Sequence, residues 1–408
     1  MLSIPREANG LMKGKLLILI AIAINNFGDI LFDLFVAWGL SINTGSFMGA
    51  VYVIGTSVGF RAFLSFFVGS FTDRHSRKKL IIVSHCASIV IIGLFGMLWS
   101  YIQSHIIIGV IFVLLNDISN EVFLRSYISL TADKFDKIDY IKFQNVASIV
   151  TRIIGIFGAA ISGFIIQNLT YNFIFTLDII TFLISLTLFT MVKDNCNSSD
   201  SYNTNTSNNF KNTLISDIKY TIQYIRNSSY IKRFIAIMLI LNLGYGFIPQ
   251  VFPIIKADEF KSASYLGFIK SFLVIGELVG LVIATKFSRY ISSSFKLSMT
   301  INFFVLFLIG VLQEKTIICV LFFIYGTSDS LTQPFFNYTV SNLDSNNRGK
   351  LLGGIDAIIM LSPSVGIYAI SFLFKYNYLI GTALLSCIFL IAYLLFRSNE
   401  EMNEIVIE

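Results

Sequence analysis

Acidic side chains recur at a four-residue spacing inside two of the long apolar runs of this sequence. One run contains Asp29 and Asp33, and another contains Asp117 and Glu121. Because residues four apart lie on the same side of an α-helix, each pair would form a polar stripe on an apolar helix. A carboxylate that is withdrawn from water takes up a proton more readily than an exposed one. These pairs are therefore candidates for groups that bind and release protons.

Some of these acids have an alternative interpretation as structural ion pairs. A charged group in the hydrocarbon region of a membrane costs about 2.5–3.5 kcal/mol, so each one indicates a cavity or a charge partner. Arg125 follows Glu121 by four residues, and Lys270 precedes Glu277 by seven, so these acids have a basic neighbour on their own helical face. Asp29 has no such neighbour within its run. It is therefore, together with Asp33, the preferred proton carrier.

The full set of candidates divides by role. For proton coupling we consider Asp29, Asp33, Asp117, Glu121 and Glu277, and as their charge partners Arg61, Arg125, Arg152 and Lys270. Three other acids inside apolar runs are interpreted as caps of helix ends: Asp178, Asp329 and Asp356. The three histidines and four cysteines have no spacing typical of metal ligands, so we expect no metal site and no cofactor.

The elements that carry these residues are predicted to be membrane-spanning helices. The chain of 408 residues is 55% hydrophobic and only 13% charged, whereas soluble domains have about 25% charged residues. A helix needs roughly 20 apolar residues to cross a bilayer, and the sequence has about twelve runs of that kind. They lie near 15–38, 47–70, 80–100, 104–124, 143–167, 171–192, 233–255, 264–286, 296–313, 316–338, 351–374 and 377–397.

A polar stretch divides these runs into two sets of six. The residues from Asp194 to Phe210 are rich in Asn, Ser and Thr and almost free of apolar side chains, a composition typical of a flexible linker. We therefore predict an N-terminal six-helix bundle at 1–192, a cytoplasmic linker at 193–231, a C-terminal six-helix bundle at 232–397 and a cytoplasmic tail at 398–408.

The basic residues predict the orientation of the helices. Most of the 30 Lys and Arg residues fall in the N-terminal segment and in every second loop, while the opposite loops contain only Lys256, Lys261, Lys315 and Lys375. Because basic loops stay on the cytoplasmic side, both termini should be cytoplasmic, in an integral protein of the cell (plasma or inner) membrane. The net charge of +6 is then explained by topology and not by nucleic-acid binding.

The loop after the second run contains a spaced set of small, acidic and basic residues. Gly69, Asp73, Arg74, Arg77 and Lys78 match the order of the loop signature of the major facilitator superfamily, although serine replaces its second glycine. A glycine permits close helix packing, and an aspartate can lie against the positive N-terminal end of another helix. The resemblance implies that these residues act as a conformational latch.

Other segments are similar to the drug and siderophore exporter branch of that superfamily, which includes macrolide-efflux proteins. Gly28-Asp29 in the first run, the Thr-Gly-Ser turn at 44–46 and Ser362-Pro363 in the eleventh run resemble this branch. The antiporter signature of the fifth run is not matched, since Ala159 and Ser162 replace its Pro and Gly. The small residues there still permit tight packing against a neighbouring helix.

The resemblance implies an all-α membrane protein with about twelve helices in two pseudo-symmetric six-helix bundles. We expect a secondary active transporter that exports a small amphipathic organic molecule, either drug-like or a siderophore, by proton antiport. No phosphate-binding G-x-x-x-x-G-K-[ST] motif is present, so the energy would come from an ion gradient. The expected partners are the substrate, protons and the lipid bilayer, with the chain acting as a monomer.

Two alternatives remain open at this stage. The same fold could work as a proton-coupled importer of a nutrient or siderophore. A non-transporting receptor or an intramembrane enzyme is a further alternative. Against an enzyme, the sequence has no HExxH motif, no nucleophile elbow and no cluster of His, Cys and Asp.

Overall fold

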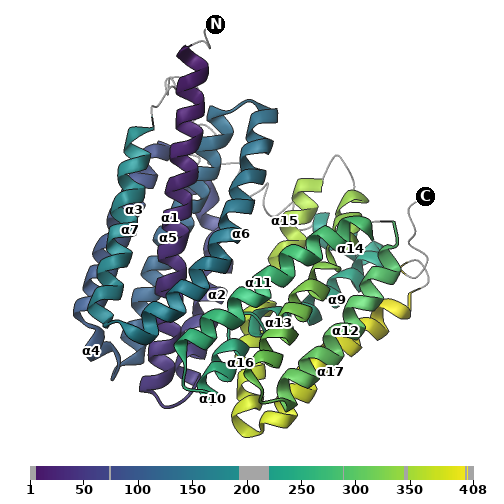
Figure 1. Ribbon diagram of the computed structural model, residues 1–408. Helices are drawn as coiled ribbons and strands as arrows, with labels where there is room; N and C mark the ends of the chain where they lie inside the picture. Colours follow the sequence, from purple (N-terminus) through teal and green to yellow (C-terminus); the bar gives the residue numbers. More distant parts are fainter. Residues whose placement is uncertain are drawn as a thin grey trace, which may run out of the picture. The chain divides into compact units, whose positions relative to one another are not determined.

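The computed structural model describes residues 6–72, 75–192, 220–287, 289–343, 348–399 and 402 (Figure 1). Within these ranges the chain is helical, with no strand, as a lipid environment demands of segments whose backbone groups must all be paired internally. The chain divides into two compact units. The first comprises Met1–Tyr202 with Ala257–Gly267, and the second comprises Asn203–Lys256 with Phe268–Glu408.

The first unit is built from long apolar helices joined by short turns. They are α1 (Arg6–Asn43), α2 (Met48–Thr72), α3 (Arg77–Met97), the single turn α4 (Trp99–Ile102), α5 (Ile106–Lys134), α6 (Lys137–Asn168) and α7 (Tyr171–Met191). Helix α1 packs against α2, α6 and α7, and α5 packs against α2 and α3. Side chains of α1, α2 and α5 are therefore brought close together.

An aromatic core fixes α1 against its neighbours in this unit. Phe35 of α1 packs against Trp99 and against Phe175 of α7, with ring centroids 4.7 and 5.0 Å apart. Phe32 packs edge-on against Phe95 of α3 at 5.3 Å. Because such aromatic pairs add stabilisation beyond the buried area itself, this core holds the acidic stretch of α1 in a defined position.

The turn between α1 and α2 accounts for one of the segments singled out in the sequence. Gly45 adopts a φ of 62°, in the left-handed region that favours glycine. The Thr44 hydroxyl donates to the carbonyl oxygen of Leu40 at 2.7 Å. The Thr-Gly-Ser sequence therefore ends α1 and reverses the chain into α2.

The small residues of α6 bring this helix close to the first residues of α11, which belong to the same unit. A Cβ atom on Gly163 would lie 2.7 Å from the carbonyl oxygen of Ala263 and 3.0 Å from the Cα of Gly267. The Gln167 side chain accepts a hydrogen bond from the Ala263 backbone at 2.7 Å. Backbone-to-backbone packing of this kind is possible only where side chains are small.

The second unit has shorter and more interrupted helices. They are α9 (Ser229–Phe247), α10 (Phe252–Glu259), α11 (Ala263–Lys286), α12 (Ile291–Val311), α13 (Lys315–Ser330), α14 (Gln333–Ser341), α15 (Arg348–Ile359), α16 (Ser362–Tyr376) and α17 (Tyr378–Arg397). Helix α12 packs against α13 and α17, and α9 packs against α16 and α17. Helices α10 and α11 extend across the boundary that separates the units.

Prolines explain why the structure has fewer continuous spans than the sequence predicts. Among the described residues, 11 helical segments are long and apolar enough to cross a membrane, against about twelve expected runs. The run near 316–338 is two helices, α13 and α14, with Pro334 in the first turn of α14. Proline has no N–H to continue the preceding helix, so this run falls below the length of a continuous span. Pro363 similarly begins α16 after α15.

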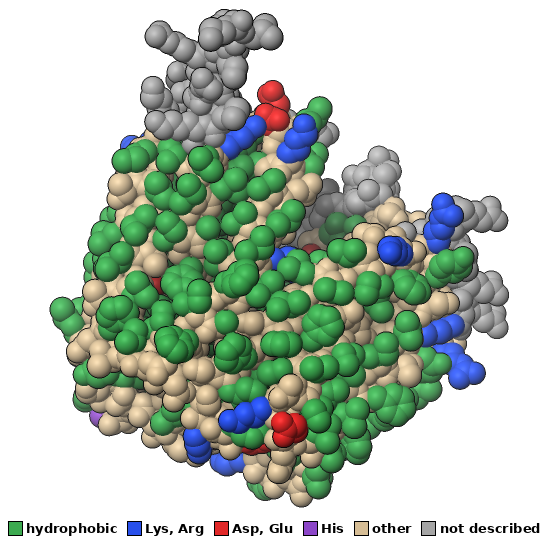
Figure 2. Space-filling view, viewed as in Figure 1, with side chains coloured by type: hydrophobic (Ala, Val, Ile, Leu, Met, Phe, Trp, Pro, Cys, Tyr) green, Lys and Arg blue, Asp and Glu red, His purple; other side chains and the backbone are tan. Residues whose placement is uncertain are grey.

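The outer surfaces of the helices are apolar. Figure 2 shows hydrophobic side chains over most of the visible helix flanks, with charged side chains mainly toward the helix ends. Phe157 and Phe164 of α6 and Val282 of α11 are each more than half exposed. Large apolar side chains on this scale are stable against lipid and not against water. The molecule is an integral membrane protein with an all-helical fold, as the sequence predicts.

Candidate functional site

The first unit contains a polar cavity of about 280 Å³ between α1, α2, α5 and α6. Its polar lining comes mostly from α1 and α5, while α2 contributes one arginine. The lining residues are Ile22, Asn25, Asn26, Asp29, Ile30, Asp33, Arg61, Asp117, Asn120, Glu121, Phe123, Leu124, Tyr127 and Thr151. Four of the five proton-coupling candidates therefore share one cavity, in agreement with the two polar stripes expected on these helices.

Arg61 links acids from two different helices. Its Nε donates to Oδ1 of Asp117 at 2.6 Å, and its Nη2 lies 4.0 Å from Oδ2 of Asp33. The Asp117 side chain is 1% exposed, whereas those of Arg61 and Asp33 are 43% and 54% exposed. A charge-assisted bond to a buried carboxylate is stronger than one at the surface. The Arg61–Asp117 pair is therefore the firmer of the two.

Asp29 has a different kind of environment from the other two acids. Its Oδ2 accepts from Nδ2 of Asn25 at 2.8 Å, and its Oδ1 accepts from Nδ2 of Asn120 at 3.2 Å. Both donors are neutral amides. Among the described residues, no Lys, Arg or His lies within ion-pair distance of Asp29. This carboxyl can gain or lose a proton without breaking a salt bridge.

The cavity has more acidic than basic groups. Asp29, Asp33 and Asp117 surround the single guanidinium of Arg61. Three ionised carboxylates with one cation would leave two unbalanced negative charges in a region of low dielectric, which is unfavourable. Proton uptake by one of the acids reduces the excess negative charge. The number of protons bound in the cavity can therefore change at a moderate cost in free energy.

Glu121 forms the local ion pair that its spacing allowed. Its Oε1 accepts from Nε of Arg125 at 2.8 Å, one helical turn along α5. This arrangement supports the structural interpretation of Glu121. Arg152 lies on α6, beside the cavity-lining Thr151.

The remaining candidate acid lies in the second unit. Glu277 and Lys270 are both on α11, and Glu277 has Asp329 and Tyr325 of α13 as electrostatic neighbours. It therefore belongs to a separate group of ionisable residues from the one around Arg61.

The latch residues that the structure describes connect helix ends within the first unit. Arg77 at the start of α3 forms an ion pair with Asp133 of α5. Nζ of Lys78 donates to the carbonyl oxygen of Val192, just beyond α7, at 2.7 Å. Asp73 and Arg74 lie outside the described residues, as do the surroundings of Gly69 within α2. The role of this loop as a latch stays a prediction.

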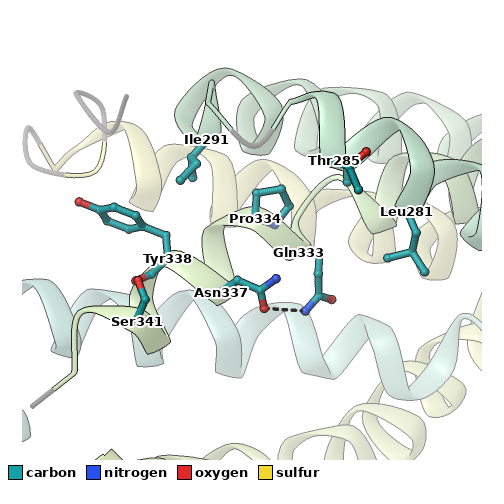
Figure 3. A pocket seen from close by; sticks show the side chains of 9 residues that line it. Leu281, Thr285, Ile291, Gln333, Pro334, Asn337, Tyr338 and Ser341 are labelled. Carbon is teal, nitrogen blue, oxygen red and sulfur yellow. Dashed lines mark hydrogen bonds between the residues drawn. The ribbon is translucent and has the colours of Figure 1, made fainter. Parts of the chain in front are cut away.

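The second unit contains a larger cavity of about 640 Å³ between α11, α12 and α14, shown in Figure 3. Most of its wall area is apolar, and none of the described residues that line it has a charged side chain: Leu281, Ala284, Thr285, Ile291, Gln333, Pro334, Asn337, Tyr338 and Ser341. Nε2 of Gln333 donates to Oδ1 of Asn337 at 3.2 Å. Pockets of roughly 300–1,000 Å³ with apolar walls and a few polar groups are typical of small-molecule sites.

Sequence reasoning missed several of these residues. Asn120 lies three positions after Asp117, a helical spacing that would have placed it on the same face. In α14, Gln333, Asn337 and Ser341 recur every four residues. This spacing could have predicted the polar side of the second cavity from the sequence.

Comparisons with known proteins place this architecture in a family. Residues 16–366 match the model of the Major Facilitator Superfamily. The chain belongs to the major facilitator superfamily. It is a membrane transporter of that type. No protein with a curated description matches this major facilitator in sequence.

Solved structures confirm the fold. A transporter of the POT family in complex with a thioalcohol-conjugated peptide has a TM-score of 0.74 at 9% identity, over 96% of both chains. The D-xylose-proton symporter has a TM-score of 0.72 at 12% identity, over 97% of this chain and 98% of that one. The human organic anion transporter MFSD10 has 0.60 at 11% identity, over 94% and 99%. At these identities the similarity establishes the fold and not the substrate.

Proposed function

We propose that this major facilitator exports a small amphipathic organic molecule in exchange for protons, with Asp29, Asp33 and Asp117 as the proton-binding group. The observation that carries this proposal is the arrangement of three acids around one arginine in a cavity of the first unit. Such a group can change its charge by one proton while the cation stays in place. A monomer in the cell membrane, with both termini cytoplasmic, belongs to the same proposal.

The hydrogen bonds of Asp29 suit both of its protonation states. When Asp29 is ionised, the amides of Asn25 and Asn120 donate to it. The Oδ1 of Asn25 is buried and has no hydrogen-bond partner. Rotation of this amide by half a turn would present Oδ1 to a protonated carboxyl, because an amide has a donor at one end and an acceptor at the other. The pair can therefore exchange a proton without losing its contact.

A neutral carboxyl also lowers the cost of closing the cavity. A charged group that loses contact with water is expensive unless it is paired, whereas a protonated acid needs only hydrogen bonds. Proton binding at Asp29 would thus favour the state in which its cavity is shut, and proton release would favour the open state. This coupling is what a proton-driven cycle of alternating access requires.

The substrate class in this proposal rests on the cavity of the second unit. Its apolar walls and its row of amide and hydroxyl groups along α14 suit a molecule that has both an apolar body and a few polar groups. Among the described residues, no Asp, Glu, His, Lys or Arg lines it, so its affinity should depend little on pH near neutrality. Recognition and proton binding would then be carried out by different units.

Transport in proteoliposomes with an imposed pH gradient tests the function. A panel of amphipathic amines, macrolides, siderophores and sugars is scanned for accumulation against a concentration gradient. For the compound that is moved, Asp29→Asn should abolish accumulation while exchange down the gradient continues. Asp258→Asn is the matched control, because Asp258 forms a surface pair with Lys261 at 2.8 Å, in which the lysine is 77% exposed.

The direction of substrate movement relative to the proton separates export from import. In antiport, substrate that leaves the side to which it was added drives protons toward that side. In symport, the protons move away from that side together with the substrate. If Asp29→Asn and Asp33→Asn both concentrate substrate as well as the parent does, the proton site is elsewhere. Glu277 and Asp117 would then be the next candidates.

A further inference from the structure

A carboxyl group on α7 is fully buried directly behind the acidic stretch of α1. Asp178 is 0% exposed, and its Oδ2 has no hydrogen-bond partner. Its Oδ1 lies 3.4 Å from the hydroxyl of Thr181, which is itself bonded to the backbone carbonyl of Asp178 at 2.6 Å. The interpretation of Asp178 as a helix cap is wrong, because it lies in the body of α7, more than one turn from either end.

Gly28 is the contact point between this carboxyl and α1. A Cβ atom on Gly28 would overlap the Thr181 hydroxyl and would lie 2.6 Å from Oδ1 of Asp178. Only glycine leaves room for the carboxyl at this position. Because Gly28 immediately precedes Asp29, the carboxyl of Asp178 lies against the same turn of α1 that carries Asp29. The Gly-Asp sequence thus has a physical role, which is to admit a second acid next to the first.

The charged groups around Asp178 are themselves acidic. From α1, Asp29 and Asp33 act on it electrostatically. From α3, the titratable group that contacts α7 is His85, whose Nε2 lies 2.9 Å from the Ser185 hydroxyl, two turns beyond Asp178. Helix α6 contacts α7 only slightly. Among the described residues, no cation pairs with Asp178.

These observations restrict the protonation states that Asp178 can adopt. An ionised carboxylate with no cation, next to two other acids, carries a large desolvation and repulsion cost. A proton on Asp178 removes that cost while Asp29 is ionised. When Asp29 is protonated, the repulsion between the two is removed as well. The two carboxyls are therefore coupled, and the state of one affects the state of the other.

We propose that Asp178 is a second exchangeable proton-binding group, coupled to Asp29 across Gly28, so that the first unit can hold two protons. A proton that leaves Asp178 would reach water through the cavity that Asp29 lines. This inference rests on the proposed function only in its use of Asp29 as a proton carrier. The binding of a proton to Asp178 is testable without any substrate.

Infrared difference spectroscopy of the purified full chain in lipid nanodiscs tests it, with pH as the only variable. Protonated carboxyl groups absorb in a separate carbonyl band, whose intensity is followed between acidic and alkaline pH. Other buried acids, such as Asp329 of the second unit, also contribute to this band, so each variant is compared with the parent by subtraction. Asp178→Asn should remove part of the pH-dependent band and change the pH at which the Asp29 contribution titrates, since Asn has the shape of the protonated acid. Asp258→Asn should leave the titration of the band unchanged.

A structural role for Asp178 gives a different result. If Asp178 keeps its proton at every pH, Asp178→Asn leaves the pH-dependent spectrum identical to that of the parent, and the proposal is overturned. Should Asp178→Asn fail to fold by size-exclusion chromatography, Asp29→Asn provides the second test. The rest of the band must then titrate at a different pH from the parent, because Asp178 has lost its acidic neighbour, and loss of the Asp29 contribution with no other change overturns the proposal. A failure to find proton-driven transport would count against the proposed function and not against this titration.

Discussion

The two cavities differ in the interaction that dominates each of them, which is electrostatic in the first and apolar in the second. The first, between α1, α2, α5 and α6, is small and is lined by four acids and one arginine, with three of the acids around that arginine. The second, between α11, α12 and α14, is more than twice as large, and among the described residues none that lines it is charged. In a low-dielectric interior, the addition of one proton changes the electrostatic energy of a group of charges greatly. The affinity of an apolar cavity for a ligand depends instead on the shape and the apolar area of the contact. A change in the first cavity should therefore affect coupling, and one in the second should affect affinity.

The largest effect is expected from loss of the guanidinium. Arg61→Gln leaves Asp117 buried without its ion-pair partner. Such a loss costs about 3–5 kcal/mol in a fully buried pair and less here, because the Arg61 side chain is 43% exposed and partly screened by water. We expect a strong drop in thermal stability together with loss of accumulation driven by the pH gradient. The double variant Arg61→Gln, Asp117→Asn should regain most of the stability, because no buried carboxylate is left without its ion-pair partner and Asp33, the other partner of Arg61, is 54% exposed. Normal stability of the single variant would contradict the pairing.

The next effect concerns the close approach of α1 and α7. Gly28→Ala places a methyl group against Thr181 and Asp178, and overpacking of this kind costs about 1–3 kcal/mol. Gly353→Ala is the matched control, since a Cβ atom there has no neighbour within 4 Å and alanine favours the helix. Thermal unfolding should separate the two variants clearly. Equal stability of both would show that α1 can move away from α7 at little cost.

A moderate effect is expected in the second cavity. Tyr338→Ala removes an aromatic wall of this cavity (Figure 3), and the loss of apolar contact should weaken substrate affinity about tenfold. The half-saturation concentration should rise while the dependence of transport on the pH gradient is retained. A changed pH dependence with unchanged affinity would reverse the roles assigned to the two cavities.

The smallest effect is expected from the pair on α5. Glu121→Gln keeps a hydrogen bond to Arg125, whose side chain is 41% exposed and can be hydrated. Pairs of this spacing contribute about 0.3–0.5 kcal/mol. We expect at most a slight decrease in gradient-driven transport, measured beside Asp29→Asn in the same vesicles. If Glu121→Gln abolishes accumulation and Asp29→Asn does not, Glu121 is the proton carrier.

Hydropathy by itself determined the class of the protein. Because each spanning helix satisfies its own backbone groups, its existence depends on about twenty consecutive residues and not on distant parts of the chain. The helical spacing of Asp29, Asp33, Asp117 and Glu121 is equally local, and the structure places all four in one cavity. The break at Pro334 could also have been read from the sequence, since proline cannot continue a helix.

Tertiary packing decided which of these residues act on one another. Arg61 and Asp117 are 56 positions apart, and only the packing of α2 against α5 makes them partners. Asp178 looked like a helix cap from its own segment, because the sequence does not show that α1 covers it at Gly28. The charge and protonation of a buried acid depend on what surrounds it in three dimensions, and that information is absent from any local stretch of sequence.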